Sequence, residues 1–312
     1  MRLGLTSAIL HDFSLAELAA FCDANRLKSL ELMCWPVASG DSRKFAGVTH
    51  VNVDDIIDNG PGLVQQTLYE NGDVAISGLG YYPNVLTADV REANVYISHL
   101  MKVIRAASIL RVPVVNTFVG RDQYKTVDAN WPQFMKIWVP LIKYAEDHGV
   151  KIGIENCPMK FTLDEWPGGK NLATSPAIWQ RMFSDIDSPN FGLNFDPSHL
   201  VLQGMDVQKA LRGFGGKLLH AHAKDLEVDY ERLDEVGFFA DKTTDWHTPR
   251  IPGNGDVPWD AFFQVLEDVG FQGDVTIEVE DPDFNTREER LGAVLDSRDF
   301  LEQFIAPDAE IA

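Results

Sequence analysis

The chain has 312 residues, 45% of them hydrophobic, which is enough to bury a sizeable core. Its 47 acidic and 27 basic residues give a formal net charge of -20, and this charge disfavours nucleic acids and anionic membrane surfaces as partners. Because the sequence lacks a run of about 18 apolar residues, a signal-peptide pattern and paired cysteines, we expect a cytoplasmic protein without membrane spans or disulfides.

Short apolar runs alternate with longer amphipathic segments along the whole chain, and we interpret them as strands and helices. The predicted strands are eight runs: residues 2–8, 27–34, 73–82, 112–120, 150–157, 191–199, 217–225 and 274–281. A helix follows each strand. The first helix begins at Ser14, where Glu17 completes a capping box, and the others cover 62–72, 89–110, 131–149, 175–186, 206–215, 259–270 and 286–305.

Eight strand–helix units in strict alternation predict a parallel sheet, and their number suggests closure into a (β/α)8 TIM barrel. Because the sequence shows neither a linker nor a shift in composition, we expect one domain over residues 1–312. Two long connections, at about 158–175 and 226–257, leave the C-terminal ends of the fifth and seventh strands. Active sites of such barrels lie at this end, so we expect both loops to contribute to function.

The last four predicted strands each end in a residue that can bind a metal ion. These residues are Glu155 in "IGIEN", Asp196 in "LNFDP", His222 in "HAHAKD" and Glu278 in "VTIEVED". Charged groups at these positions are costly to bury unless they share a partner, and one divalent cation provides it. Three carboxylates and one histidine favour Mn²⁺, with Mg²⁺, Co²⁺ or Zn²⁺ as alternatives.

Two of these positions have a neighbour on the same face of the strand. His222 is preferred to His220 because it lies nearer the mouth of the barrel, which leaves His220 behind the ligand or deeper in the core. Glu278 is preferred to Glu280 because Glu280 is followed by an Asp-Pro pair that is typical of a barrel rim. Glu280 stays an open alternative.

Several other polar residues near the strand ends are candidates for substrate binding. His199 follows Asp196 by three residues and is expected in a loop over the metal ion. Lys224 ends the seventh strand, where it could hold a substrate hydroxyl or orient a carboxylate; a plain ion pair with Asp225 is the alternative. Asn116 and Arg121 close the fourth strand and are further candidates, and the long loops add Lys160, Trp166 and Arg250, for which ordinary loop packing is the alternative.

At these motifs the sequence resembles the sugar phosphate isomerase/epimerase family of xylose isomerase-like barrels, which includes ketose 3-epimerases and inositol-catabolism enzymes. The resemblance covers nearly the whole chain. It is most specific in "IENCPM", "DEWPGGKNLATSPAIW", "GLNFDPSHL", "HAHAKD", "PRIPGNGDVPW" and "IEVED". It implies that Glu155, Asp196, His222 and Glu278 bind one divalent cation and that His199 contacts the substrate.

The sequence departs from the ketose epimerases at two positions. A second glutamate six residues after the first ligand is Phe161 here, and an arginine six residues after the metal-binding histidine is Val228. Both departures weaken the assignment to a plain ketose 3-epimerase. Similar barrels act on 3-keto-glycosides and cleave C-glycosidic bonds with a small partner subunit, so this activity is the first alternative.

Together these features predict a metal-dependent isomerase or epimerase of a small sugar, keto-sugar or cyclitol. Glu155 and Glu278 come from strands three apart in the ring, so one can remove a proton next to a carbonyl while the other returns it. The cation would stabilise the enediolate between these two steps. The alternatives are a 3-keto-glycoside lyase or C-glycoside deglycosidase subunit, an abasic-site endonuclease, which the net charge disfavours, and a non-catalytic sugar sensor. A homo-oligomer or a small partner subunit is compatible with each of them.

Overall fold

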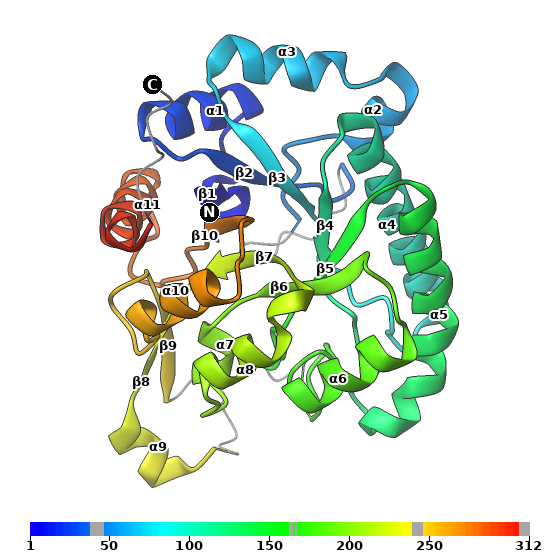
Figure 1. The fold of residues 1–312 in the computed structure, drawn as a ribbon, viewed down its shortest axis with the longest axis vertical. Coiled ribbons are helices and arrows are strands. Elements are labelled where there is room, and N and C mark those ends of the chain that lie inside the picture. The colour runs from blue at the N-terminus through cyan, green and yellow to red at the C-terminus, as the bar shows by residue number, and fades with distance from the viewer. Residues whose placement is uncertain (38–46, 162–164, 166, 239–245, 306–312) are drawn as a thin grey trace.

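In the computed structural model, eight parallel strands close a barrel. The structure describes residues 1–37, 47–161, 165, 167–238 and 246–305. The barrel strands are β1 (Arg2–Thr6), β2 (Ser29–Met33), β3 (Ala75–Gly80), β4 (Val114–Thr117), β5 (Lys151–Glu155), β6 (Phe191–Phe195), β7 (Leu218–Ala223) and β10 (Asp274–Ile277). They follow one another in the ring as β1-β10-β7-β6-β5-β4-β3-β2, and β2 pairs with β1 to close it (Figure 1). The predicted (β/α)8 TIM barrel is confirmed.

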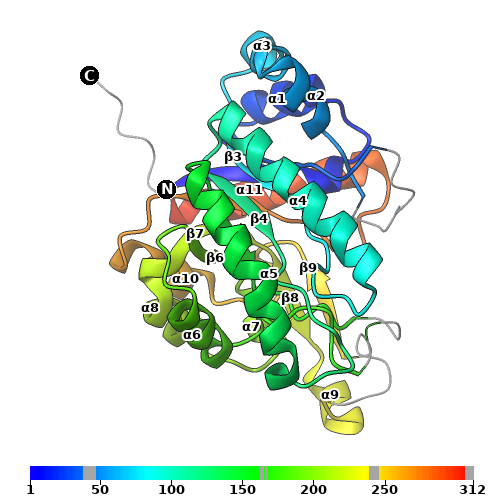
Figure 2. The ribbon, with the colours of Figure 1, turned by 90° about the vertical axis from the view of Figure 1, so that its right-hand side faces the viewer.

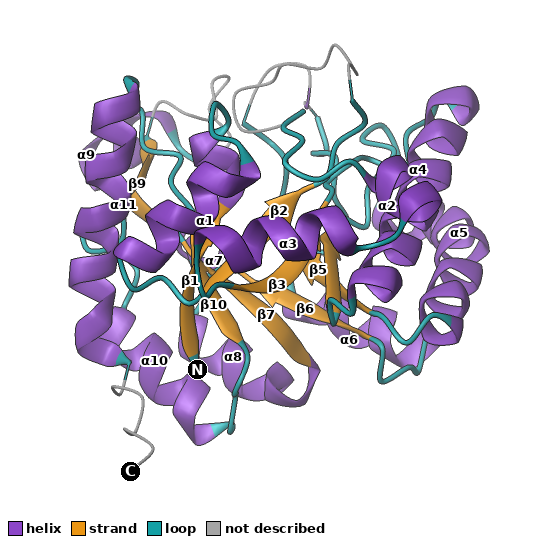
Figure 3. Cartoon of the chain, turned by 90° about the horizontal axis from the view of Figure 1, so that it is seen from above, coloured by secondary structure: helices purple, strands orange, loops and turns teal. Residues whose placement is uncertain are grey.

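Helices surround the strands, as Figure 3 shows from above. They are α1 (Leu15–Ala24), α2 (Val53–Asn59), α3 (Gly62–Asn71), α4 (Val90–Leu110), α5 (Val127–Asp147), α6 (Pro176–Asp185), α8 (Val207–Phe214), α10 (Trp259–Asp268) and α11 (Arg287–Leu301). Short 3-10 helices are η1 (Ser7–Leu10), η3 (Gly215–Lys217) and η4 (Glu302–Phe304). The predicted start of α1 is confirmed, since Ser14 and Glu17 form the capping box. Helix α2 was not predicted.

The strands are buried on both faces because helices cover the outside of the barrel and side chains fill its inside. All residues of β2 and of β6 are buried. The long helices α4 and α5 lie side by side against the barrel (Figure 2), and α4 turns Leu100, Val103 and Ala107 inward at helical spacing. The packed ring holds the C-terminal ends of the strands in fixed relative positions.

None of the described helices is long and apolar enough to serve as a membrane span.

The connection predicted as a long loop at 226–257 contains regular structure. Strand β8 (Asp225–Val228) and strand β9 (His247–Arg250) form an antiparallel hairpin, and helix α9 (Tyr230–Val236) lies between them in the chain. Figure 1 shows these elements projecting from the barrel at the lower left. The hairpin escaped prediction because its strands are only four residues long and because β9, "HTPR", contains no apolar run and includes a proline.

The base of this hairpin is fastened by one buried carboxylate. Asp225 accepts hydrogen bonds from the backbone N–H groups of Gly253 (2.9 Å) and Val257 (3.0 Å) and from Nε1 of Trp259 (2.8 Å). The alternative ion pair with Lys224 is therefore wrong, because Lys224 contacts other carboxylates. We expect Asp225→Ala to lower the free energy of unfolding by about 3–5 kcal/mol, since several donors lose one charged acceptor together. Urea denaturation measures this loss.

Asp229 provides a matched control in the same hairpin. It is the N-cap of α9 and accepts from the Arg232 N–H at 2.9 Å in an exposed position. Asp229→Ala is expected to cost about 1 kcal/mol, the usual effect of losing a cap. Equal losses for the two variants would contradict the role given to Asp225.

Candidate active site

The C-terminal ends of four strands bring the four predicted metal ligands together. One possible ligand atom from each of Glu155, Asp196, His222 and Glu278 lies within 4.8 Å of the others. The first three are buried, and Glu278 keeps 16% of its side chain exposed. Among the described residues, Glu280 is not part of this group. We call these four residues the carboxylate–histidine cluster.

Local structure explains why these side chains converge. Glu155 is the last residue of β5 and pairs in register with Asn194 of β6. Asp196 directly follows β6, and its Oδ1 accepts from the Ser198 N–H (2.8 Å) at the start of the short helix α7 (Ser198–Val201). The N–H of Glu278 donates to the Ala223 carbonyl, which continues the pairing of β10 with β7. Parallel strands end at the same rim, so their last residues become neighbours.

The donor atoms of the cluster fit a divalent cation. Asp196 Oδ2 and His222 Nδ1 are buried without a hydrogen bond of normal geometry, and both belong to the cluster. The three carboxylates also have ion-pair contacts with Lys224 and His199, and a bound cation would share or replace these contacts. Hard oxygen donors with one imidazole are ligands that Mn²⁺, Mg²⁺, Co²⁺ and Zn²⁺ accept. The cluster therefore suggests a divalent metal site.

Lys224 is the main positive charge beside this cluster. Its Nζ lies 3.1 Å from Asp196 Oδ2, 3.1 Å from Glu278 Oε2 and 3.2 Å from Glu280 Oε2, and the side chain is buried. Burial alone would lower the pKa of Lys224, but the carboxylates outweigh it and raise that pKa well above its usual value. Lys224 is therefore an ammonium ion in direct contact with two carboxylates of the cluster.

His199 also contacts the cluster, although it lies in helix α7 and not in the expected loop. Its Nε2 is 3.1 Å from Glu155 Oε1 and 3.1 Å from Asp196 Oδ2. Burial would lower the pKa of His199, and neighbouring groups including Asp196 raise it well above the usual value. The ring of Phe161 lies beside it, with ring centroids 6.2 Å apart. The position that departs from the ketose epimerases thus packs against a candidate substrate-binding residue.

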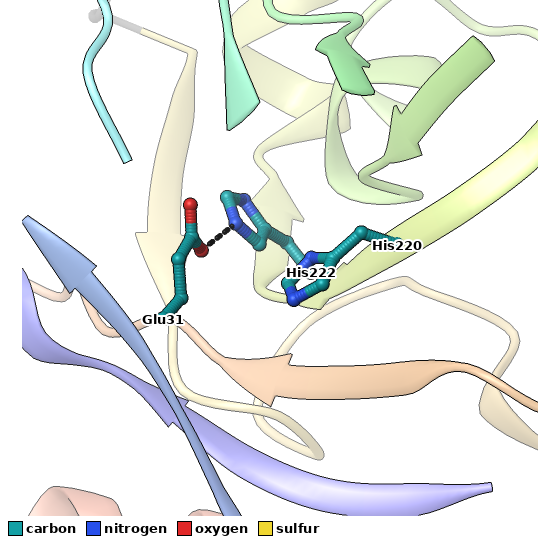
Figure 4. A group of neighbouring side chains, drawn as sticks. All are labelled: Glu31, His220 and His222. Carbon is teal, nitrogen blue, oxygen red and sulfur yellow. Dashed lines mark hydrogen bonds and ion pairs between the residues drawn. The ribbon is translucent and has the colours of Figure 1, made fainter. Parts of the chain in front are cut away.

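Glu31 of β2 is a functional candidate that the sequence did not reveal to us. Its Oε2 lies 2.6 Å from His222 Nε2 (Figure 4). Burial would raise the pKa of Glu31, but His222 outweighs it and lowers that pKa to about 2. His220 lies deeper, with Nδ1 3.0 Å from Asn194 Oδ1 and Nε2 3.1 Å from Ser77 Oγ. The sequence signal that could have indicated Glu31 was an acidic residue inside the largely apolar strand "SLELM".

Two cavities share Arg121 in their linings. One, of about 140 Å³, is lined in part by Trp35, Tyr82, Phe118 and Arg121. The hydroxyl of Tyr82 donates to Glu31 Oε1, and Glu31 in turn contacts His222 of the cluster. The other, of about 170 Å³, is lined in part by Arg121, Lys160, Gln203 and Trp246.

Among the described residues, the others predicted to bind substrate lie at different distances from the cluster, and some of them do not contact it. Asn116 is buried and donates from Nδ2 to Glu31 Oε1 (3.1 Å), a carboxylate outside the cluster. Arg121 lies between the two cavities and donates to the Gly168 carbonyl (2.5 Å). Arg250 is not brought to the cluster. Its ion pair with Glu227 (2.9 Å) lies within the β8–β9 hairpin, and its ion pair with Asp283 (2.7 Å) connects the hairpin to the segment after β10. Trp166 lies outside the described residues.

Binding of a cation to this cluster should depend on pH. Burial lowers the pKa of His222, but Glu278 (3.0 Å from Nδ1) and Glu31 outweigh burial and raise that pKa well above its usual value. A cation that binds Nδ1 must displace a proton, so protons compete with it more strongly as pH falls. We expect the affinity for Mn²⁺ to rise about tenfold per pH unit between about pH 6 and about pH 8. Calorimetric titration at several pH values measures it; a flat profile would remove His222 Nδ1 from the ligand set.

The sequence is similar to proteins of one family over most of its length. Residues 44–304 match a sequence model described as the xylose isomerase-like TIM barrel. The uncharacterised protein YfiH of Bacillus subtilis (strain 168) is 26% identical over 214 residues, which cover 62% of this chain and 64% of YfiH. An inosose dehydratase of Clostridium perfringens (strain 13 / Type A) is 32% identical over 91 residues, 28% of this chain and 30% of that protein. The chain thus matches less than two thirds of the length of these curated relatives.

Solved structures share the fold at low sequence identity. The IOLI protein, solved with a zinc atom, has a TM-score of 0.69 at 17% identity, covering 98% of this chain and 100% of that chain. D-psicose 3-epimerase from Clostridium cellulolyticum H10, solved with D-tagatose, has a TM-score of 0.69 at 14% identity, covering 97% and 99%. With the fold, the cluster and the sequence match in agreement, the chain belongs to the xylose isomerase-like TIM barrel family.

Proposed function

We propose that the protein is a divalent-cation-dependent isomerase or epimerase of a small sugar, keto-sugar or cyclitol. The observation that carries the proposal is the carboxylate–histidine cluster, whose ligand atoms lie within 4.8 Å of one another. The shared fold with D-psicose 3-epimerase, solved with D-tagatose, supports a carbohydrate as substrate. The cavity beside Tyr82 and Phe118 supports it too, because aromatic rings can pack against the C–H face of a sugar.

Glu155, Asp196, His222 and Glu278 would hold the cation. When bound, such an ion acts as a Lewis acid on neighbouring substrate oxygens and stabilises the negative charge that proton removal creates. The zinc atom in the IOLI structure supports a divalent ion in this fold. Among the candidate ions, we favour Mn²⁺ because three of the four donors are carboxylates.

Glu155 and Glu278 would move the proton. Burial and the charge of Glu278 raise the pKa of Glu155, whereas Lys224 and His222 outweigh burial and lower the pKa of Glu278. Two carboxylates whose pKa values are shifted in opposite directions fit a pair of one acid and one base. One removes the proton next to the substrate carbonyl, and the other returns it at the new or inverted centre; the reverse reaction exchanges these roles.

Lys224 and His199 would stabilise the charged intermediate and orient the substrate. Both contact Asp196 at 3.1 Å and both have raised pKa values, so positive charge is already fixed where an oxyanion would develop. Charge that is positioned before the reaction requires little rearrangement during it.

Proton exchange in D₂O tests the proposal directly. The protein is loaded separately with Mn²⁺, Mg²⁺, Co²⁺ and Zn²⁺ and incubated with free, phosphorylated and 3-keto sugars and with keto-cyclitols. We expect one substrate to incorporate deuterium next to its carbonyl and to form an isomer, in a reaction that a chelator stops. The absence of exchange with every substrate and metal would refute the proposal.

Dehydration of a keto-cyclitol is the second candidate, and the local similarity to an inosose dehydratase favours it. Elimination begins with the same proton removal and then needs an acid for the departing hydroxyl, a role that the charged side chains of His199 or Lys224 could take. The same screen separates the two reactions. An isomer has the mass of its substrate, whereas dehydration forms a product that has lost water and absorbs in the ultraviolet as a conjugated enone.

A further inference from the structure

Glu31 is a charged residue fully buried in the interior of the barrel, and hydrogen bonds from four strands or strand ends hold it. Its Oε2 lies 2.6 Å from His222 Nε2 and accepts from Thr6 Oγ1 at 3.1 Å. Its Oε1 accepts from Asn116 Nδ2 at 3.1 Å and from the hydroxyl of Tyr82. A carboxylate buried this deeply is costly unless its acceptor sites are filled, and here four donors fill them.

The backbone around Glu31 leaves room for this arrangement. A Cβ atom at Gly80 would lie 2.9 Å from Glu31 Oε1, and one at Gly153 would lie 2.4 Å from Asn116 Oδ1. Any larger residue at Gly80 would press on the carboxylate or on the nearby Met33 side chain. The two glycines thus leave space for the Glu31 carboxylate and for the side chain of Asn116, which donates a hydrogen bond to it.

A second cation site at this place does not fit the contacts. Glu31, His220 and His222 do place possible ligand atoms within 4.8 Å of one another. However, both ring nitrogens of His220 already have partners, Asn194 and Ser77, and the oxygens of Glu31 have four donors. A cation here would have to break several of these bonds, so Glu31 needs another explanation.

The ring of His222 connects Glu31 to the carboxylate–histidine cluster. Its Nε2 faces Glu31, as Figure 4 shows, and its Nδ1 lies 3.0 Å from Glu278 Oε2. We infer that Glu31 is a positioning residue for the cation site. Its carboxylate accepts a hydrogen bond from the Nε2–H of His222, and this keeps the Nδ1 lone pair directed at the cation. The inference rests on the cation site of the proposed function. It does not depend on whether the enzyme isomerises or dehydrates its substrate.

The Asn194 side chain offers the competing arrangement. Its Nδ2 is 3.0 Å from His222 Nε2, so it could donate to an unprotonated Nε2 if Glu31 were neutral. The shorter contact, 2.6 Å, is the one to Glu31, and Asn194 Nδ2 has the Tyr82 hydroxyl at 3.2 Å as another acceptor. The observed distances therefore favour a proton on Nε2 that is shared with Glu31.

Cation affinity tests the inference without any substrate. Titration of the metal-free protein with Mn²⁺, followed by the electron paramagnetic resonance signal of the free ion, gives the dissociation constant. We expect Glu31→Gln to weaken Mn²⁺ binding by about 10- to 100-fold, the usual effect of losing a carboxylate behind a histidine ligand. Ser77→Ala, which removes one of the two partners of His220 in the same buried interior, should leave the constant within about twofold.

A spectroscopic measurement separates positioning from a general loss of stability. In the Zn²⁺-loaded protein, the ¹H–¹⁵N correlation of the His222 ring should show a slowly exchanging proton on Nε2, and Glu31→Gln should make this proton exchange faster, because a neutral amide is a weaker acceptor than a carboxylate. Thr6→Val keeps the carboxylate and removes one of its hydrogen bonds, so we expect the proton to remain and Mn²⁺ affinity to fall about two- to tenfold. This variant keeps the test valid even if Glu31→Gln fails to fold.

Two results would overturn the inference. One is a Glu31→Gln variant that folds and binds Mn²⁺ as tightly as the natural protein. The other is a Zn²⁺-loaded protein whose His222 carries no proton on Nε2. If the natural protein binds no divalent cation, both the inference and the proposed cation site are wrong. If it binds Mn²⁺ but exchanges no substrate proton, the reaction is wrong and the role of Glu31 stands.

Discussion

Glu155→Gln is expected to keep the fold and to convert substrate about 10²- to 10⁴-fold more slowly, because one of the two proton-transferring carboxylates is lost. Gln has nearly the same size, and its amide oxygen can still face His199 Nε2, which lies 3.1 Å from the carboxylate. The rate of substrate conversion and of deuterium incorporation should be measured at saturating Mn²⁺, so that weaker metal binding does not account for the loss.

Glu280→Gln is the matched control for this variant. Glu280 contacts the same lysine, with Oε2 3.2 Å from Lys224 Nζ, but it lies outside the carboxylate–histidine cluster. We expect its rate to stay within about tenfold of the natural protein. A large loss in Glu280→Gln together with an active Glu278→Gln would transfer the ligand role to Glu280. Full activity in Glu155→Gln would exclude Glu155 as an acid or base.

Asp196→Asn is expected to abolish the stabilisation of the protein by a divalent cation. A cation that binds the folded state alone, at 100 times its dissociation constant, raises the free energy of unfolding by about 2.7 kcal/mol. Because the neutral amide is a poor replacement for a carboxylate ligand, the same Mn²⁺ concentration should give the variant almost no increase. Thermal unfolding with and without Mn²⁺ measures the difference.

The comparison with and without cation is made within each protein, so any change in the intrinsic stability of Asp196→Asn cancels. The amide oxygen can still accept from the Ser198 N–H, so the start of helix α7 should persist. If the variant gains as much stability from Mn²⁺ as the natural protein, Asp196 is not a ligand.

The sequence revealed Glu155, Asp196, His222 and Glu278 because each stands at the end of an apolar run. Parallel strands of a barrel end at one rim, so four separate local patterns were enough to predict one site before any contact was known. Glu31 gives no comparable signal. Its donors Thr6, Asn116 and His222 are 25, 85 and 191 residues away in the sequence, and closure of the ring alone brings them together.

Other differences between sequence and structure have local physical causes. Lys224 and Asp225 are neighbours in the sequence, which suggested an ion pair, but β7 ends before them. Lys224 then points to Asp196 and Glu278, while Asp225 holds the base of the hairpin. Arg250 was a candidate for substrate binding because it lies in a long loop, yet in the antiparallel hairpin β8–β9 it faces acidic residues.

Lys224 and His199 have a consequence for how the protein matures. Because an ammonium group and an imidazole already stand at 3.1 Å from Asp196, the acidic rim carries its own counter-ions. The polypeptide can therefore complete its barrel before any metal arrives, unlike small domains that stay unfolded until they are loaded. Binding of the proposed cation would then be an exchange, in which the ion takes over contacts from these positive charges in an already folded protein.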